Sequence, residues 1–255
     1  MAAQIEVALA RRNHLPQRTL CATGKRMSRQ ALVQKRPYLI LSVVAALVFY
    51  YLRVTELPEI YLWPIKGSAC AFLAVYAFLR HSSPPARVLA TAMVVAALAD
   101  MAVEFDLRVG AGVFIVFHAL MIKLFVAHNR GAMDGRDNLI LLGLLIVPPL
   151  AGYMLTGSGG TAWATAIYGA VLGVMAASAW SSTFPRWTVG AGAILFVVSD
   201  LLIFAGLGPL ADNPFREYLV WPIYFLGQFL MTVGVITTLR KRDPELAVVQ
   251  GGRAD

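Results

Sequence analysis

Eight apolar runs of roughly 20 residues each follow one another along this 255-residue chain. A helix needs about 20 apolar residues to cross the hydrocarbon core of a bilayer. The runs are residues 37–54, 60–79, 87–105, 109–127, 138–156, 161–181, 186–207 and 218–239. Short segments rich in Pro, Gly and charge separate them, so that no soluble domain is inserted. We therefore expect an all-α polytopic membrane protein, a bundle of eight transmembrane helices.

The composition is typical of a membrane protein and differs from that of a soluble protein. Hydrophobic residues make up 58% of the chain and charged residues only 14%, against about 25% charged in soluble proteins. The net charge of +8 does not indicate nucleic-acid binding, because the positive residues lie mainly in the N-terminal segment and in short loops. We expect a basic, disordered arm at 1–36, the transmembrane domain at 37–239 and a cytoplasmic tail at 240–255.

The distribution of Lys and Arg predicts the orientation of the bundle. If the N-terminus is cytoplasmic, 17 of the 22 Lys and Arg residues lie on the cytoplasmic side and only three, Arg53, Arg108 and Arg216, lie opposite. Cytoplasmic loops carry an excess of positive charge in membrane proteins. Both termini are therefore predicted to be cytoplasmic, in a multi-pass protein of the cell membrane.

Rare polar residues in five of the predicted spans fall at one depth. At about 1.5 Å of rise per residue, they occupy a layer roughly 8 Å deep in the outer half of the bilayer. They are Lys66, Asp100, His118, Asp200, Tyr224 and Gln228. Glu104 follows Asp100 by four residues on the same helical face. Because an ionisable residue at a span centre costs roughly 2.5–3.5 kcal/mol, such residues face the interior and usually mark a site.

Structural roles remain open as alternatives for each of these side chains. Asp100 and Lys66 are also consistent with a buried ion pair that only fixes helix register. Asp200, next to Ser199, is also consistent with hydrogen bonds across helices. Glu104 is near enough to the interface for a solvated position at the rim.

The same holds for the uncharged polar residues of the layer. A lone His118 on an apolar face is typical of a hydrogen-bonded core residue. Tyr224 and Gln228, one turn apart, are also consistent with plain hydrogen bonding between helices.

Several chemistries lack the residues they need. His118 is the only histidine within a predicted span, so we expect no metal site. No G-x-S-x-G serine motif and no phosphate-binding loop occurs, and we expect no cofactor. Two neighbouring carboxylates in a low-dielectric cavity tend to share a proton. One is then a general acid and the other a base, which fits hydrolysis of an acid-labile bond in a lipid.

Two segments resemble the YhhN family of lysoplasmalogenase-like membrane proteins. The run ALADMAVEFDLRVGAGVFIVFHALMIKLF, at 97–125, is similar to the family's first signature, with Asp100, Gly110, Phe114 and His118 in the matching positions. The run GAILFVVSD, at 192–200, closely resembles a second family segment that ends at Asp200.

Smaller pieces extend the resemblance over residues 40–240. YGAVLGVMAASA is similar to the family's sixth helix, and YFLGQ, with Tyr224 and Gln228, to its eighth. Lys66 stands where the family has Lys-Pro, but Gly67 follows it here, and Ala99 replaces a Gly before Asp100. The chain is thus identified as a divergent member.

The resemblance implies hydrolysis of the vinyl ether bond of a lysoplasmalogen, or of another ether lipid. It implies acid/base roles for Asp100 and Asp200. The expected substrate-binding residues are Lys66, Glu104, His118, Tyr224 and Gln228. Two other classes stay open: a proton-coupled small-molecule transporter and a lipid-binding membrane protein without catalysis. The expected partners are the lipid substrate and the bilayer, with no nucleic acid, and the oligomeric state is left open.

Overall fold

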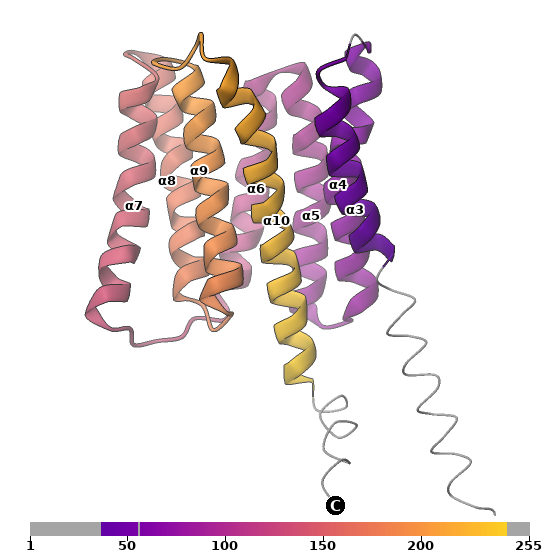
Figure 1. The fold of residues 1–255 in the computed structure, drawn as a ribbon. Coiled ribbons are helices and arrows are strands. Elements are labelled where there is room, and N and C mark those ends of the chain that lie inside the picture. The colour runs from indigo at the N-terminus through magenta and orange to yellow at the C-terminus, as the bar shows by residue number, and fades with distance from the viewer. Residues whose placement is uncertain (1–36, 56, 244–255) are drawn as a thin grey trace, which may run out of the picture. The chain divides into compact units, whose positions relative to one another are not determined.

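The computed structural model describes residues 37–55 and 57–243, apart from the side chains of Glu59 and Glu217. These residues form a helical bundle whose rods run side by side (Figure 1). The elements are α3 (Pro37–Leu52), α4 (Glu59–Arg80), α5 (Pro84–Phe105), α6 (Leu107–Val126), α7 (Gly135–Leu155), α8 (Gly160–Ser181), the π-helical turn η1 (Arg186–Gly190), α9 (Ala191–Gly206) and α10 (Pro214–Arg242). The predicted arm at 1–36 and residues 244–255 of the predicted tail lie outside the described residues.

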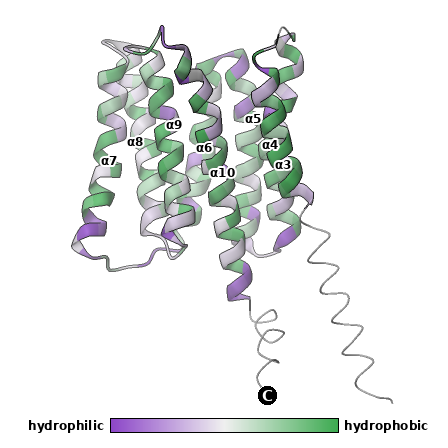
Figure 2. Cartoon of the chain, viewed as in Figure 1, coloured by the Kyte–Doolittle hydropathy of each residue, from purple (hydrophilic) through white to green (hydrophobic). Residues whose placement is uncertain are grey.

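The predicted membrane bundle of eight helices is confirmed. Within the described part of the chain, seven helical segments are long and apolar enough to cross a membrane, and α3 is a shorter apolar helix of 16 residues. Each coincides with one predicted span, the seventh being η1 continued by α9. Apolar residues run along the helices and hydrophilic residues gather near their ends (Figure 2).

Side-chain caps explain why some helices begin where they do. Asp106 is the single residue between α5 and α6, and its carboxylate accepts hydrogen bonds from the backbone N–H groups of Arg108 at 2.7 Å and Val109 at 3.0 Å. Such a cap satisfies amide groups that have no partner within the helix. The chain therefore reverses within one residue, and α5 and α6 are forced to pack as neighbours.

Helix α10 begins one turn earlier than hydropathy predicts. The span was expected from residue 218, because Arg216 and Glu217 interrupt the apolar run. In the structure the helix starts at Pro214, and the Asn213 side chain accepts a hydrogen bond from Phe215 N at 3.0 Å. Proline is favoured in a first helical turn because its missing N–H would be unpaired there anyway. This extra turn places Arg216 on an ordered helix.

Glycines allow α7 and α8 to pack backbone against backbone. A Cβ atom built on Gly169 of α8 would lie 2.5 Å from the carbonyl oxygen of Pro148 in α7, and one on Gly152 would lie 2.5 Å from that of Thr165. Small residues at helix interfaces let backbones approach closely, which is how helices associate where no water drives them together.

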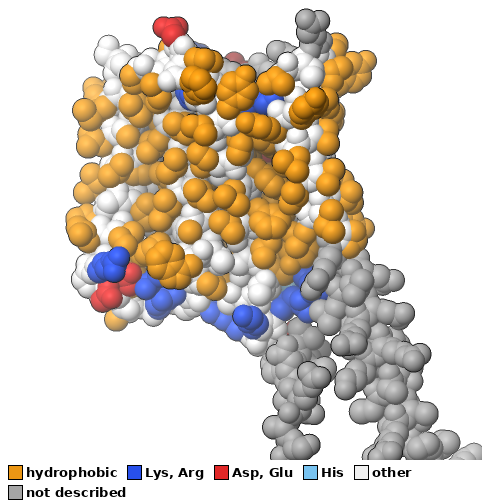
Figure 3. Space-filling model, in the orientation of Figure 1, with side chains coloured by type: hydrophobic (Ala, Val, Ile, Leu, Met, Phe, Trp, Pro, Cys, Tyr) orange, Lys and Arg blue, Asp and Glu red, His pale blue; other side chains and the backbone are white. Residues whose placement is uncertain are grey.

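Positive charge gathers at one end of the bundle. Figure 3 shows a broad band of apolar side chains and a lower edge where Lys and Arg are concentrated. This basic end carries Arg80, Arg87, Arg130, Arg136, Arg186 and the last turn of α10. Arg53, Arg108 and Arg216 lie at the opposite end, among the other helix ends. The charge separation agrees with the predicted orientation, which stays a prediction.

Candidate functional site

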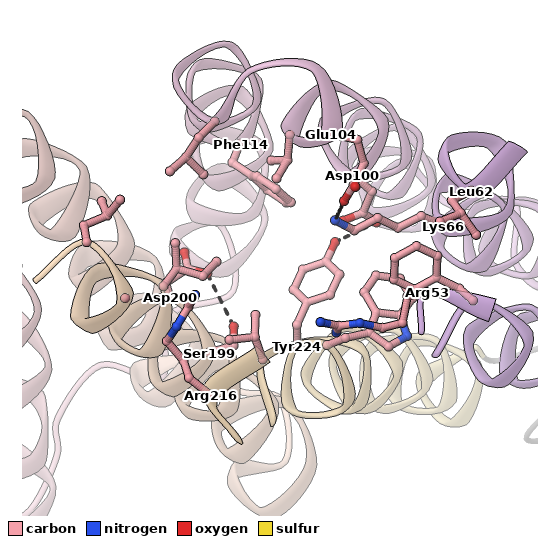
Figure 4. Close-up of a pocket in the computed structure, with 18 of the residues that line it drawn as sticks. Arg53, Leu62, Lys66, Asp100, Glu104, Phe114, Ser199, Asp200, Arg216 and Tyr224 are labelled. Carbon is pink, nitrogen blue, oxygen red and sulfur yellow. Dashed lines mark hydrogen bonds and ion pairs between the residues drawn. The ribbon is translucent and has the colours of Figure 1, made fainter. Parts of the chain in front are cut away.

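A cavity of about 660 Å³ opens at the end of the bundle opposite the basic end (Figure 4). Helices α3, α4, α5, α6, α9 and α10 and their connecting segments supply its walls. The lining residues are Phe49, Arg53, Thr55, Leu57, Leu62, Lys66, Asp100, Val103, Glu104, Leu107, Phe114, Ser199, Asp200, Ile203, Gly206, Leu207, Arg216, Val220, Trp221 and Tyr224. The volume is in the range of sites that bind small molecules.

Asp100 enters the cavity from α5 and is only 2% exposed. The Tyr224 hydroxyl donates a hydrogen bond to Asp100 Oδ2 at 3.0 Å, which links α10 to α5. Tyr224 is held in turn, because Gln228 Nε2 donates to its oxygen at 3.2 Å. The Cys70 thiol of α4 lies 3.5 Å from the same hydroxyl. A buried carboxylate is tolerated here because neighbouring helices supply its polar partners.

Asp200 enters the cavity from α9 and is 6% exposed. The Tyr168 hydroxyl of α8 donates to Asp200 Oδ2 at 2.8 Å, and His118 Nε2 lies 3.2 Å from the Tyr168 oxygen. Because the single hydroxyl proton of Tyr168 points to Asp200, the histidine Nε2–H is the donor to the tyrosine. A row of His118, Tyr168 and Asp200 thus crosses α6, α8 and α9. Ser199 adds a longer contact of 3.4 Å to Asp200 Oδ1.

The two carboxylates therefore have separate partners although they line one cavity. Figure 4 shows Asp100 and Asp200 on different sides of it, with Tyr224 reaching toward Asp100. Each is oriented by a tyrosine from a different helix. Such an arrangement fixes the carboxylates in space and leaves room between them for a substrate.

Lys66 forms an ion pair with Glu104, one turn beyond Asp100 on α5. The two side chains are 14% and 26% exposed, and the Lys66 ammonium lies 5.5 Å from the ring centroid of Phe49 and 5.8 Å from that of Trp221. The alternative expectation, an ion pair of Lys66 with Asp100, is therefore wrong about the partner. Asp100 and Glu104 lie on the same face of α5, and Glu104, which is nearer the end of the helix, forms the ion pair with Lys66.

Of the seven predicted site residues, five line the cavity and two lie behind it. Lys66, Asp100, Glu104, Asp200 and Tyr224 contribute to its surface. The remaining two, His118 and Gln228, are fully buried and contact the tyrosines instead.

The residues that sequence reasoning missed are Tyr168, Arg53 and Arg216. Tyr168 lies eight residues into α8, at the depth of the polar layer. This depth is the feature of the sequence that indicates it. In the sequence, the two arginines indicate only the orientation of the bundle, although both line the cavity.

Aromatic rings close the cavity toward the middle of the bundle. Phe117 and Phe196 are fully buried and stack with centroids 5.5 Å apart, while Phe114 and Tyr224 meet Phe196 edge-on at 5.8 and 5.2 Å. Below this aromatic floor lie buried side chains such as Met121, none of which lines the cavity. The cavity therefore does not extend past the middle of the bundle into the half that carries the basic end.

The donor set favours proton chemistry. Among residues 37–55 and 57–243, no three His, Cys, Asp or Glu side chains gather as a metal site would require. Two buried carboxyl groups with fixed tyrosine partners can hold and release protons inside a cavity of restricted water access.

Comparison with known proteins identifies a family. The model of the YhhN family matches residues 61–235, which include every lining residue from α4 to α10. No curated protein and no solved structure matches the chain.

Proposed function

Because the chain belongs to the YhhN family, we propose that it is an integral membrane lipid hydrolase of the lysoplasmalogenase kind. Its substrate is a lysoplasmalogen or a related ether lipid. Hydrolysis of the vinyl ether bond yields a fatty aldehyde and a glycerophospho-headgroup. We also place it in the cell membrane, with both termini in the cytoplasm. The observation that carries the proposal is the pair of buried aspartates, Asp100 and Asp200, in one cavity.

The proposed reaction begins with proton transfer. One carboxylic acid protonates the vinyl carbon that is not bonded to oxygen, and the neighbouring carbon becomes an oxocarbenium ion. The second carboxylate stabilises this positive charge, which is worth most where water is scarce. Protein dipoles oriented in advance need not reorganise as the charge develops.

Water completes the reaction. A water molecule adds to the oxocarbenium carbon, and its proton passes to the second carboxylate. The resulting hemiacetal collapses to the aldehyde and the free glycerol hydroxyl, so that one water is consumed per lipid. Tyr224 and Tyr168 hold the two carboxylates at fixed positions throughout.

The proposal is tested by measuring aldehyde release from a lysoplasmalogen by the purified full-length protein in detergent. Asp100→Asn and Asp200→Asn keep the side-chain shape and the acceptor oxygen for the tyrosine, but they cannot exchange the proton. We expect each to lower kcat by roughly 100-fold or more, because general acid–base catalysis contributes about that much. Asp212→Asn, in the exposed segment before α10, is the matched control and should keep full activity.

The outcome also separates the two other classes. Retained activity in both Asp100→Asn and Asp200→Asn would remove these residues from the mechanism. Uptake of a solute into proteoliposomes, with no lipid turnover by the wild type, would favour a transporter. Binding of lysolipid without product at any pH would favour a binding protein without catalysis.

A further inference from the structure

We propose that Arg53 and Arg216 bind the phosphate of the lipid headgroup at the mouth of the cavity. This contact makes the protein select phosphate-bearing lysolipids over neutral ether glycerols. The inference rests on the proposed function and deepens it, since it assigns the headgroup end of the same cavity. Among the described residues that line the cavity, Lys66 is the third basic one, and it is ion-paired within the protein.

Lys66 is committed to neighbours within the protein. Its ammonium is ion-paired with Glu104 and lies over the rings of Phe49 and Trp221. Moving it to a lipid phosphate would leave the Glu104 carboxylate partly buried without its counter-ion. That exchange is unfavourable, because breaking such a pair strands a charge away from water.

The two arginines line the cavity from the ends of two different helices. Arg53 follows the last turn of α3, and Arg216 lies in the first turn of α10, as Figure 4 shows on either side of Tyr224 in that view. Both are half-buried and line the cavity. The Arg53 guanidinium lies 5.9 Å from the ring centroid of Tyr218, one turn before the cavity wall at Trp221.

The end of α9 is shaped to receive Arg216. Gly206, its last residue, lines the cavity, and a Cβ atom built there would collide with the Arg216 guanidinium. The missing side chain therefore gives the guanidinium its place against the helix end. A cation is also favoured beside the carboxyl end of a helix. The arginine is thus positioned by the fold at the rim of the cavity.

The spacing along the helices matches the length of the substrate. Arg216 precedes Tyr224 by eight residues, or about 12 Å of helix, and Gly206 follows Asp200 by six, or about 9 Å. Six bonds separate the phosphorus from the oxygen-bearing vinyl carbon, roughly 7 Å of extended chain. The arginine side chain and a hydrogen bond of about 3 Å account for the difference between this length and the distances along the helices. A phosphate held at the rim therefore sets the vinyl ether at the level of Asp200 and of Tyr224, whose hydroxyl donates to Asp100.

Guanidinium groups suit this ligand better than an ammonium group would. Arginine presents a planar fork of donors that matches two phosphate oxygens at once, and it is weakly hydrated.

The test compares two substrates that differ only in the phosphate. The full-length protein in detergent is given a lysoplasmalogen or the matching 1-alkenylglycerol, and KM and kcat are measured separately. We expect Arg53→Gln with Arg216→Gln to raise KM for the lysoplasmalogen by roughly tenfold to 100-fold. The two substrates should then become nearly equal. Arg108→Gln, an exposed arginine at the same end of the bundle, is the control and should keep the wild-type preference.

A second variant preserves the charge and moves only its position. Gly206→Ala keeps both arginines, but its added methyl group makes the Arg216 guanidinium move away from the end of α9, so the preference for the lysoplasmalogen should weaken. It also tests the proposal if the double arginine variant does not fold. An unchanged substrate preference in Gly206→Ala and in the double arginine variant would overturn the proposal.

Binding without turnover separates this inference from the proposed reaction. A saturated ether lysophospholipid cannot be cleaved at a vinyl bond, so its effect on thermal unfolding is compared with that of the matching alkylglycerol. Stabilisation by the lysophospholipid alone, lost in the arginine variants, supports the phosphate site even if no aldehyde is ever released. Equal stabilisation by both lipids would overturn it, whatever the activity.

Discussion

The Tyr224 hydroxyl and the Asp100 carboxylate meet at 3.0 Å, although 124 residues separate them in the chain. The bond joins α10 to α5 across the wall of the cavity. Its donor is itself fixed by Gln228, one turn further along α10. Two side chains of α10 therefore orient the Asp100 carboxylate on α5.

Tyr224→Phe should impair the reaction more than it impairs folding. The change leaves an oxygen of Asp100 and the amide of Gln228 without a partner, which costs about 1–3 kcal/mol. We expect a lower midpoint of thermal unfolding in detergent and a fall in kcat of roughly tenfold. Tyr153→Phe, on α7 away from the cavity, should change neither quantity. A variant with normal kcat would mean that Asp100 does not need this bond.

Tyr168→Phe should act on the other carboxylate. Tyr168 is the only link between His118 and Asp200 that the structure gives within its described residues. Its loss leaves two buried polar groups without their partner, so kcat and the unfolding midpoint should both fall. His118→Ala, which keeps the bond from Tyr168 to Asp200, should retain more of the catalytic rate than Tyr168→Phe does. The reverse order would place His118 nearer to the chemistry than the geometry does.

Lys66 and Glu104 should show coupled effects on stability. Lys66→Met and Glu104→Gln each leave a partly buried charge without its counterpart, whereas the double variant removes both charges. In a thermal-unfolding cycle we expect a coupling free energy of about 1–2 kcal/mol, with the double variant less destabilised than the sum of the singles. Strict additivity would show that the pair is not formed.

The interface of α7 and α8 should not tolerate a methyl group at its closest point. Gly169→Ala would press a Cβ atom against the carbonyl oxygen of Pro148, and overpacking of this kind costs about 1–3 kcal/mol. Gly143→Ala, on α7, meets no atom within 4 Å and is the matched control. Unfolding midpoints of the two variants should therefore separate clearly. Equal midpoints would indicate that the helices move apart at little cost.

Helix positions and depths were predictable from the sequence, because both depend only on rise per residue along apolar runs. That is why Lys66, Asp100 and Asp200 were expected in one layer, and the structure places all three on one cavity. The early start of α10 was not predictable from hydropathy. It depends on the local cap by Asn213, which outweighs two charged residues in the first turn.

Rotation of each helix about its axis was not predictable, because the hydrophobic pattern of a membrane helix gives little directional signal. His118 and Gln228 share the depth of the aspartates, yet their side chains point behind the cavity wall. The partner of Lys66 was ambiguous for a related reason, since Asp100 and Glu104 lie one turn apart on the same face. Tyr168 was not predictable as a site residue, because an uncharged tyrosine within an apolar span does not by itself indicate a polar site.

The aromatic floor formed around Phe117 and Phe196 closes the cavity on one side, so that it opens toward only one end of the bundle. Among the described residues, none beyond these rings lines the cavity that holds the two acids. Under the proposed reaction, the fatty aldehyde would be released into the leaflet that supplied the lipid and the glycerophospho-headgroup into the water on the same side. Turnover would then draw lipid from one face of the membrane and not from the other.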